Sequence, residues 1–522
     1  MTENIIRQTK TLCPECLKIL PADIFEREGK VWIRKRCEEH GEFTDLYYGD
    51  YGMYLKAMKW QHDGKGIKNP NTKFEGCPMS CGLCNQHKSH TALANIVITN
   101  RCDLACFYCF FYAKAMGYVY EPSLNQIRLM LRNLRQEKPV STNALQLTGG
   151  EPMLREDIVD IVKMAKEEGF DHVQLNTNGI RLSHDPEFGK IIRSAGVNHL
   201  YLSFDGVTAK TNPKNHWEVP RIFKNCRDTG MGIVLVPVVM RGINDHEVGD
   251  ILKFGLKNID IVRGVNYQPV SLVGRISKAD REKMRITIPD VIKNIEEQTS
   301  GTVVKEDWYP VPTVTAFTHF IEAITNRQKY ELTAHPVCGM ATYLFKDNDK
   351  IIPITRFVDV EGLTEYLDEK AKEVRDGKSR LLVGAEMIFR LNKFIDKEKQ
   401  PKGLNLANIL FNVLKNRDYG ALRIFHHKTM FLGMMHFQDK FNYDIERVKR
   451  CCIHYAQPDG KIVPFCAFNV IPEWYRDKIQ MKFSLSIEEW EKQNNKSLKE
   501  DLYVRDAKKL ENEPLYKKCY GL

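Results

Sequence analysis

The chain has no hydrophobic run long enough to cross a membrane. Its longest apolar stretch, around Ile233–Met240, has the length of a strand, whereas a membrane-spanning helix needs about 18 or more apolar residues. The first residues, MTENIIRQTK, contain no apolar core of the kind that directs secretion. Low-complexity segments are also missing, and hydrophobic (43%) and charged (28%) residues have the frequencies of a globular protein. We therefore expect a cytoplasmic protein, and 522 residues predict about three or four folding units.

Cysteine, in contrast, is abundant. In a reducing cytosol the 15 cysteines are expected to be metal ligands or catalytic thiols rather than disulfides. Nine of them form three groups in the first 109 residues: Cys13, Cys16 and Cys37; Cys77, Cys81 and Cys84; Cys102, Cys106 and Cys109. The last two groups share the spacing C-x3-C-x2-C, which random placement does not explain. Metal ligation is therefore the default interpretation.

The first 60 residues predict a small metal-binding module. Cys13-Pro-Glu-Cys16 has the form of a tight knuckle, and Cys37 and His40 form a second knuckle after the strand-like segment 31–36. Four such ligands in two turns suit a tetrahedral mononuclear site. The arrangement resembles a zinc ribbon or a rubredoxin-like site, with histidine as the fourth ligand. Zinc would make the module structural and iron would make it redox-active, and the spacing does not decide between them.

A regular alternation of strands and helices begins at about residue 93. Six short apolar or β-branched runs recur at intervals of about 30 residues, over 94–99, 144–148, 172–176, 199–203, 233–238 and 262–268. Helical patterns lie between them, for example over 124–136 and 157–168. Such a series predicts right-handed βαβ units. Residues 93–300 are therefore expected to form a partial (β/α)6 barrel of the α/β class, with its chemistry at the carboxyl ends of the strands.

Residues 301–522 predict a mainly helical C-terminal domain. Helices are expected over 376–415, with a break at 401–403, and over 439–450, where the helix ends at Cys451 and Cys452. A turn at 458–460 is expected to place Cys466 on a strand. The polar segment 61–92, ahead of the barrel, predicts a loop wrapped around a second metal site.

The third cysteine group directly follows the first barrel strand. Cys102, Cys106 and Cys109 occupy one short loop, with Tyr108 just before the last cysteine. Three thiolates hold three irons of a 4Fe–4S cluster and leave the fourth iron open to a small molecule. Gly149-Gly150-Glu151-Pro152 follows the second strand. Its glycines permit a close backbone approach, and its carboxylate can receive an ammonium group.

These motifs, in this order and on this strand pattern, resemble those of the radical S-adenosylmethionine (SAM) enzymes. The resemblance implies that the cysteines of the third group bind the catalytic cluster and that Gly149, Gly150 and Glu151 hold the methionyl amine of SAM. It also implies that four further residues are candidates for contacts with the ribose and carboxylate of SAM: Asn176, Asn178, Ser203 and Asp205. Turn formation and strand capping are the alternative roles of these four residues, above all for Asn178 and Asp205. An external electron donor and a closed, dry pocket are implied as well.

Two further 4Fe–4S clusters are expected outside the barrel. Cys77, Cys81 and Cys84 are interpreted as one auxiliary site, with Cys226 or a C-terminal cysteine as its fourth ligand. A third cluster is suggested by Cys338, Cys451, Cys452 and Cys466, an arrangement similar to the C-terminal auxiliary-cluster domains of other radical SAM enzymes. Cys226 and Cys338 have an alternative role as small buried hydrophobic residues. Cys519 is expected to be a free thiol.

Over nearly its whole length the chain resembles the archaeal tetraether lipid (macrocyclic archaeol) synthases. The resemblance implies a long-chain isoprenoid phospholipid as substrate, carbon–carbon bond formation between its tails, and association with a membrane surface. The same group of sequences has also been described as 7,8-dihydro-6-hydroxymethylpterin dimethyltransferases, so methylation of a pterin precursor is the alternative. A non-catalytic iron–sulfur electron carrier and an RNA-modifying protein are two further alternatives. No RNA-binding module is evident, and no nucleic acid partner is expected.

Two features of the C-terminal part favour a lipid substrate. Residues 390–450 contain 13 Lys and Arg against six Asp and Glu, so +7 of the net charge of +10 lies in this stretch, which could face anionic headgroups. The apolar segments 387–395, 406–414 and 431–437 could line a channel for an isoprenoid tail. A solvated basic surface and ordinary helix core are the alternative explanations.

Overall fold

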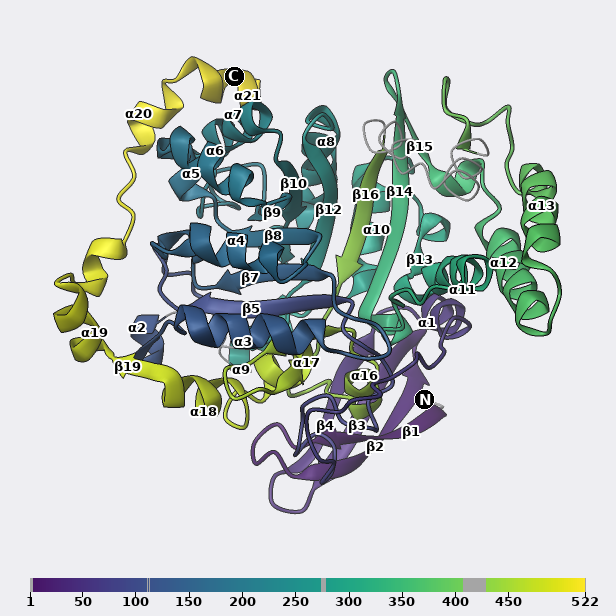
Figure 1. The fold of residues 1–522 in the computed structure, drawn as a ribbon, viewed down its shortest axis with the longest axis horizontal. Helices are drawn as coiled ribbons and strands as arrows, with labels where there is room; N and C mark the ends of the chain where they lie inside the picture. The colour runs from purple at the N-terminus through teal and green to yellow at the C-terminus, as the bar shows by residue number, and fades with distance from the viewer. Residues whose placement is uncertain (1–2, 110, 112, 274–277, 407–428, 522) are drawn as a thin grey trace.

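The computed structural model describes the chain except residues 1–2, 110, 112, 274–277, 407–428 and 522. Its centre is a parallel sheet with helices on its outer face (Figure 1). All six predicted barrel strands are present and pair in chain order. They are β5 (Leu93–Thr99), β7 (Ala144–Gly149), β8 (His172–Thr177), β9 (His199–Ser203), β10 (Gly232–Val236) and β12 (Val262–Pro269).

The crossover helices form where amphipathic patterns follow capping residues. In α3 (Leu124–Arg135), the Ser123 side chain and Gln126 form a reciprocal capping box, and Ile127, Met130, Leu131 and Leu134 turn to the sheet. The helices predicted over 124–136 and 157–168 are confirmed. The helices around the barrel are α2 (Ala113–Met116), α3, α4 (Ile158–Glu167), α5 (Ile180–His184), α6 (Pro186–Ala195), α7 (Val219–Thr229), α8 (Val248–Lys257), α9 (Lys278–Met284) and α10 (Ile288–Gln298).

Strands from the C-terminal part extend the barrel sheet at both ends, which the sequence did not predict. β16 (Thr429–Met435) pairs in parallel with β12, and β17 (Ile453–Ala456) pairs in parallel with β5. Among the described residues β16 and β17 do not pair with each other, so the parallel sheet stays open. The outer strands are antiparallel: β13 (Tyr309–Pro310), β14 (Gly339–Asp347) and β15 (Lys350–Pro353) lie beyond β16, and β18 (Ile462–Pro464) lies beyond β17.

Residues 436–452, which we call the crossing segment, connect β16 to β17 across the open side of the barrel. Only α16 (Ile445–Lys449) is helical here, so the helix predicted over 439–450 is shorter than expected. The reason is local: Asp439 Oδ1 accepts from Phe441 N at 2.9 Å, and Asn442 Oδ1 accepts from Asp439 N at 2.9 Å. Side chains that bond their own backbone in this way compete with a helix.

The N-terminal module is a separate four-stranded antiparallel sheet in the order β1-β2-β3-β4. Its strands are β1 (Asn4–Leu12), β2 (Ile19–Arg27), β3 (Lys30–Cys37) and β4 (Gly41–Tyr48), and α1 (Tyr51–Met58) follows. It lies against the crossing segment, beside α16 (Figure 1). A buried ion pair joins Arg7 to Asp444 at 2.5 Å, and Thr9 Oγ1 donates to the same carboxylate at 2.7 Å.

A peripheral group of helices forms its own hydrophobic cluster: α11 (Thr315–Thr325), α12 (Val360–Arg375) and α13 (Arg380–Arg390). The apolar segment 387–395 packs here, with Met387, Leu391 and Ile395 buried. The expectation that this segment lines a channel is therefore wrong, because its buried residues belong to helix core. Residues 407–414 of the segment 406–414 lie outside the described part of the chain.

The last 60 residues wrap around the barrel (yellow in Figure 1). They contain α17 (Phe465–Val470), α18 (Arg476–Gln480), β19 (Ser484–Ser486), α19 (Ile487–Asn494), α20 (Ala507–Glu511) and α21 (Pro514–Tyr520). β19 pairs with β6 (Tyr118–Tyr120), and Arg505 forms an ion pair with Glu218 at 2.6 Å. Among the described helices, none is both long and apolar enough to span a bilayer.

Candidate functional site

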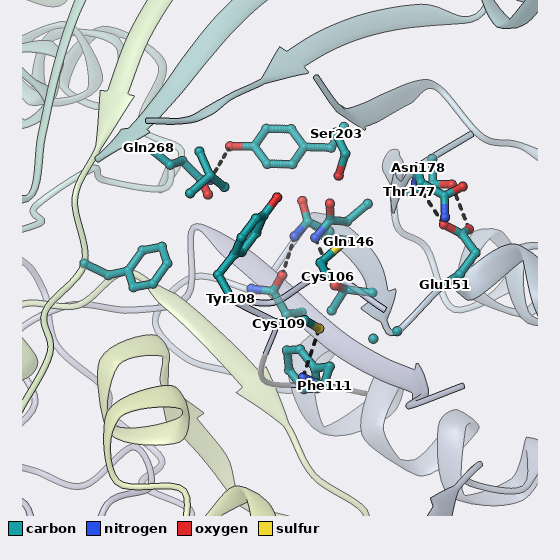
Figure 2. Close-up of a pocket in the computed structure, with 18 of the residues that line it drawn as sticks. Cys106, Tyr108, Cys109, Phe111, Gln146, Glu151, Thr177, Asn178, Ser203 and Gln268 are labelled. Atoms are coloured by element: carbon teal, nitrogen blue, oxygen red, sulfur yellow. Dashed lines mark hydrogen bonds between the residues drawn. The ribbon is translucent and has the colours of Figure 1, made fainter. Parts of the chain in front are cut away.

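A cavity of about 260 Å³ lies at the carboxyl ends of the barrel strands. The thiol-bearing residues Cys102, Cys106 and Cys109 all line it, as do Gly149, Gly150, Glu151, Asn176, Asn178 and Ser203. The predicted site residues of the barrel therefore come together at one place; Figure 2 labels Cys106, Cys109, Glu151, Asn178 and Ser203 among them. Asp205 is the exception, because it does not line the cavity but contacts Tyr108, which does. This is the edge of a parallel barrel at which functional groups collect.

Gly149 and Gly150, at the end of β7, must be glycines because the backbone that leads into the cysteine loop passes very close to them. Gly149 has φ +148°, and a Cβ there would lie 1.9 Å from the carbonyl oxygen of Thr99. A Cβ on Gly150 would lie 2.0 Å from the carbonyl oxygen of Arg101. Both backbones are joined here, because Gly150 N donates to Thr99 O at 2.8 Å and Glu151 N donates to Arg101 O at 2.7 Å. Any larger residue would push the cysteine loop away from the cavity.

The Glu151 carboxylate is held by three donors on the side of the cavity next to β8 (Figure 2). Thr177 Oγ1 donates to it at 2.7 Å, the backbone N–H of Asn178 at 2.8 Å and that of Met153 at 3.0 Å. Burial, and then the nearby charge of Asp103, raise the pKa of Glu151 to about 8. A cationic group that enters the cavity would lower this pKa again and favour the carboxylate.

Asn178 has a positioning role that agrees with the turn-forming alternative. Its Nδ2 donates to Asp103 in the cysteine loop at 2.6 Å, and its Oδ1 accepts from Ile180 N at 2.9 Å. The side chain thus ties the loop to the start of α5. Asn176 lines the cavity, and its Nδ2 donates to Thr148 Oγ1 at 3.1 Å.

Asp205 is the centre of a buried polar group that the sequence did not reveal. Its Oδ2 accepts from Tyr108 OH at 2.6 Å and pairs with Lys214 Nζ at 2.8 Å, while its Oδ1 accepts from Val238 N at 3.0 Å. Burial raises the pKa of Cys106, and the charge of Lys214 acts in the opposite direction. Asp205 thus anchors the cysteine loop, and Lys214 brings a positive charge to the thiols. No motif singled out Lys214.

One wall of the cavity consists of amide and hydroxyl groups that extend across the inner faces of the strands (Figure 2). Gln146 Nε2 donates to Asn95 Oδ1 at 2.8 Å, and Gln174 Nε2 donates to Gln146 Oε1 at 2.6 Å. Gln268 Nε2 donates to Tyr201 OH at 3.3 Å. All but Gln174 line the cavity, so an occupant would meet both donors and acceptors there.

The wall on the open side of the barrel is largely apolar. Met435 and Phe437, next to the open side of the barrel, line it together with Ile453, Tyr455 and Phe465. Met435 and Phe437 belong to the apolar segment 431–437, so that segment reaches the cavity, and its role in a channel for an isoprenoid tail stays a prediction.

The N-terminal module brings its four predicted ligands together. The ligand atoms of Cys13, Cys16, Cys37 and His40 lie within 4.8 Å of one another. Cys37 Sγ lies 3.5 Å from His40 Nδ1, and the Sγ atoms of Cys16 and Cys37 are 3.9 Å apart. The hydrogen bond with His40 lowers the pKa of Cys37 to about 6, which favours the thiolate. Three soft donors and one imidazole at this spacing fit a tetrahedral metal ion.

The second cysteine group lines a smaller cavity in the segment 74–87. Cys77, Cys81 and Cys84 all face it. Cys226 does not, because it is fully buried in α7 within the barrel core. Cys226 therefore has its alternative role as a small hydrophobic residue, and the proposal that it is the fourth ligand is wrong.

The C-terminal cysteines gather around Arg447 on the open side of the barrel. Arg447 Nε donates to Cys338 Sγ at 3.3 Å, and Cys338 raises the pKa of both Cys452 and Cys466 after the larger effect of burial. Cys451 is in the same group, since Cys466 raises its pKa. Contrary to expectation, Cys466 lies in the first turn of α17, because the strand β18 ends at Pro464.

An unpartnered donor near Cys466 fits an anionic iron–sulfur group. Among the described residues, Tyr443 OH is buried without a hydrogen-bond partner, and Tyr443 lies close enough to Cys81 and Cys466 for each thiol to raise its pKa after burial. The Gln438 side chain bonds Cys466 and lowers its pKa against the larger effect of burial. A buried donor normally has a partner, so Tyr443 indicates an acceptor such as a cluster sulfide. Cys519 is a free, partly buried thiol packed against the barrel core.

Where the structure describes the basic stretch, its cations divide into two groups. Those between residues 390 and 402 are exposed, as the alternative of a solvated basic surface predicts: Arg390, Lys393, Lys397, Lys399 and Lys402. Those after residue 439 are half-buried or buried. Arg447 and Arg450 are buried, and Arg450 pairs with Asp63 at 2.7 Å and with Glu446 at 2.8 Å. Lys440 pairs with Glu473 at 2.7 Å. Residues 407–428 of the stretch lie outside the described part of the chain. Lys440, Lys449 and Arg450 thus neutralise nearby acidic groups.

Comparisons with known proteins agree with this geometry. Residues 96–255 match the radical SAM superfamily, and residues 5–49 match the HMPTM N-terminal zinc ribbon domain. The chain is 46% identical over 500 residues to 7,8-dihydro-6-hydroxymethylpterin dimethyltransferase of Methanocaldococcus jannaschii, covering 93% of this chain and 97% of that one. It is 29% identical over 214 residues to GTP 3′,8-cyclase of Marinobacter nauticus, covering 39% and 62%. Among solved structures, methylornithine synthase matches with a TM-score of 0.32 and 16% identity, covering 41% and 64%.

Proposed function

This chain belongs to the family of the 7,8-dihydro-6-hydroxymethylpterin dimethyltransferase within the radical SAM superfamily, and on that premise we propose that it methylates carbon atoms of a dihydropterin. As a radical SAM enzyme it uses SAM, a 4Fe–4S cluster and an external electron donor, so it is not merely an electron carrier. This proposal reverses the order suggested by the sequence alone, in which lipid coupling came first and pterin methylation was the alternative.

The observation that carries the proposal is the amide wall of the cavity. A pterin ring presents an alternating edge of N–H donors, ring nitrogens and a carbonyl oxygen. Gln146, Asn95, Tyr201 and Gln268 offer matching acceptors and donors on one side of the cavity. The printed contacts use only one N–H of each of the Gln146 and Gln268 amides, so a saturated isoprenoid tail would leave their second N–H groups without partners. Each unpaired buried group costs about 1–3 kcal/mol. A small polar heterocycle therefore fits this wall better than a hydrocarbon.

The residues around the cavity would have different roles in binding the cluster and SAM and in excluding water. Cys102, Cys106 and Cys109 would hold the cluster, which together with SAM supplies a 5′-deoxyadenosyl radical. Glu151 would receive the amine of SAM, because its carboxylate is fixed by three donors and faces the cavity. Lys214 would balance negative charge near Cys106. The apolar wall would keep water from the radical.

The test is an anaerobic assay of the fully loaded enzyme. It is incubated with SAM, dithionite and 6-hydroxymethyl-7,8-dihydropterin, and in parallel with an archaeol phospholipid in place of the pterin. We expect 5′-deoxyadenosine and a methylated pterin by mass spectrometry, with the lipid leaving SAM at the rate of the enzyme alone. Lipid-dependent SAM cleavage without any response to the pterin would overturn the proposal.

Coupling of isoprenoid tails is the second candidate, and two observations favour it. The apolar wall of Met435, Phe437 and Phe465 adjoins the open side of the barrel, where a tail could enter. In addition, α13 exposes apolar side chains, with Leu381 87% and Phe389 84% exposed, which suits contact with a membrane surface. This candidate predicts coupled tails and about two 5′-deoxyadenosines per new bond, because two hydrogens must be removed.

A further inference from the structure

His87 lies where the fourth ligand of the second cysteine group is needed. It lines the small cavity together with Cys77, Cys81 and Cys84. His87 N donates to Cys84 O at 3.1 Å, so a tight turn places its side chain directly beyond the third cysteine. Three thiolates hold only three irons of a 4Fe–4S cluster, and a closed auxiliary site needs one more donor atom.

The hydrogen bonds of His87 leave one ring nitrogen free for a metal. Nε2 lies 2.8 Å from the carbonyl oxygen of Cys451, and a carbonyl oxygen only accepts, so Nε2 carries the proton. In a neutral ring with a protonated Nε2, Nδ1 bears the lone pair. A hydrogen bond from the distal nitrogen to a carbonyl is the arrangement that orients metal-bound histidines.

A buried chain of hydrogen bonds fixes this tautomer further. Thr91 Oγ1 donates its one proton to Glu137 at 2.7 Å, so it accepts from His454 Nδ1 at 2.8 Å. A neutral His454 with a protonated Nδ1 has an unprotonated Nε2, which lies 3.1 Å from His87 Nε2. The proton of His87 Nε2 is therefore shared between two acceptors, His454 Nε2 and the carbonyl oxygen of Cys451. His454, Thr91 and Glu137 are all buried. The proton of His87 thus belongs to Nε2, and Nδ1 is unprotonated.

The other described residues around this cavity do not offer a comparable donor atom. Ser80 Oγ donates to Gly76 O at 3.1 Å and accepts from Glu75 N at 2.9 Å. Lys449 Nζ is paired with Glu446 at 2.7 Å and is cationic. Gln86 is exposed. The remaining lining residues carry no side-chain donor atom, and none of the C-terminal cysteines lines the cavity.

We propose that His87 is the fourth ligand, through Nδ1, of a 4Fe–4S cluster held by Cys77, Cys81 and Cys84. The inference depends on the assignment of this cysteine group to a cluster, and it is independent of which substrate the enzyme takes. An imidazole ligand in place of a thiolate makes the cluster less negative, so its reduction potential is higher than with four cysteines. The hydrogen bond to Cys451 O also joins this site to the C-terminal cysteine group.

The experiment is pulsed EPR of the reduced, fully loaded protein with 15N-labelled histidine. We expect a directly bound histidine nitrogen in the wild type and its loss in His87→Ala and His87→Cys. His87→Cys should keep the iron content and shift one midpoint potential to lower values. His90→Ala is the matched control, because His90 is also buried nearby and its Nε2 accepts from Glu331 N at 3.0 Å, but it does not line the cavity.

Two outcomes would overturn the inference. Nitrogen coupling that persists in both His87 variants, or that is absent from the wild type, would assign the fourth position to another group. Iron and sulfide content that is unchanged in Cys81→Ala would show that this cysteine group holds no cluster. The pterin assay is run on the same preparations, so a failure of the proposed substrate would be recognised separately.

Discussion

Replacing Gln146 by leucine tests whether the amide wall recognises the substrate. Leucine has a similar volume, lacks both polar groups and leaves the cavity apolar at this position. Gln146 is 6% exposed, donates to Asn95 at 2.8 Å and accepts from Gln174 at 2.6 Å. The change therefore removes one cavity-lining amide and also leaves two buried neighbours without a partner.

The size of the effect follows from these contacts. Two unpaired buried groups cost about 1–3 kcal/mol each in the free energy of unfolding. For the substrate, the loss of one buried hydrogen bond to a neutral group costs a further 1–3 kcal/mol, which corresponds to about 5- to 160-fold in kcat/KM. A lipid tail would make no hydrogen bond to Gln146, so kcat/KM for a lipid substrate would be unchanged or higher in Gln146→Leu than in the wild type.

Gln174→Leu is the matched control for this prediction. It breaks the same 2.6 Å hydrogen bond to Gln146, but Gln174 does not line the cavity. Both variants should lose similar stability in chemical denaturation, whereas only Gln146→Leu should lose pterin-dependent formation of 5′-deoxyadenosine to the stated extent. Equal loss of kcat/KM in both variants would refute substrate recognition by the wall and leave only a structural role for Gln146.

Three further predictions concern the metal sites. Alanine in place of any one of Cys102, Cys106 and Cys109 should abolish SAM cleavage. Each change should also remove about four of the roughly twelve irons expected for three clusters, while the mononuclear metal is retained. SAM cleavage that survives any one change would contradict the assignment. Asp205→Asn leaves Lys214 buried and unpaired, which should lower the free energy of unfolding by about 3–5 kcal/mol. Iron should therefore leave the predicted catalytic site faster in the presence of a chelator. Adding Lys214→Met removes the unpaired charge and should restore most of the lost stability and iron retention. Metal affinity of the N-terminal module should decrease with falling pH, because the Cys13 thiol, whose pKa is raised by burial, must lose its proton to bind, and the decrease should become steeper below pH about 6, where the Cys37 thiolate is protonated as well; the same slope above and below pH 6 would show that Cys37 is not a ligand.

The six barrel strands could be predicted because a buried parallel strand is a short apolar run at a regular spacing. The N-terminal site could be predicted because its four ligands lie in two local knuckles. The strands β16 and β17 could not be predicted, because each joins the sheet by pairing with a strand more than 160 residues away in the chain. The helix predicted over 439–450 failed because Asp439 and Asn442 bond the backbone locally, which hydrophobic periodicity does not report.

The candidate catalytic cysteines and the two glycines beside them could be found because motif and spacing are local. Lys214 and Tyr108 could not be assigned a role, because their connection passes through Asp205, and only the folded chain brings the three together. The amide wall was also hidden. Asn95, Gln146 and Gln174 each occupy the inner face of a different strand, and a single polar residue within an apolar run gives no sign of its neighbours.

The crossing segment explains why a metal-binding module precedes the barrel. Lys35 of β3 donates to the carbonyl oxygens of Lys440 at 3.0 Å and Phe441 at 2.9 Å, and Arg7 pairs with the buried Asp444, whose pKa it depresses against the opposing effect of burial. The same segment carries Cys451 and Cys452, so the module braces the backbone that presents these thiols. If the metal only stabilises the contact between the module and the crossing segment, its loss should make the predicted C-terminal cluster dissociate more readily. The reduction potential of that cluster should not change as long as the cluster stays bound. This position, away from the cavity, favours zinc in a structural role over a redox-active iron.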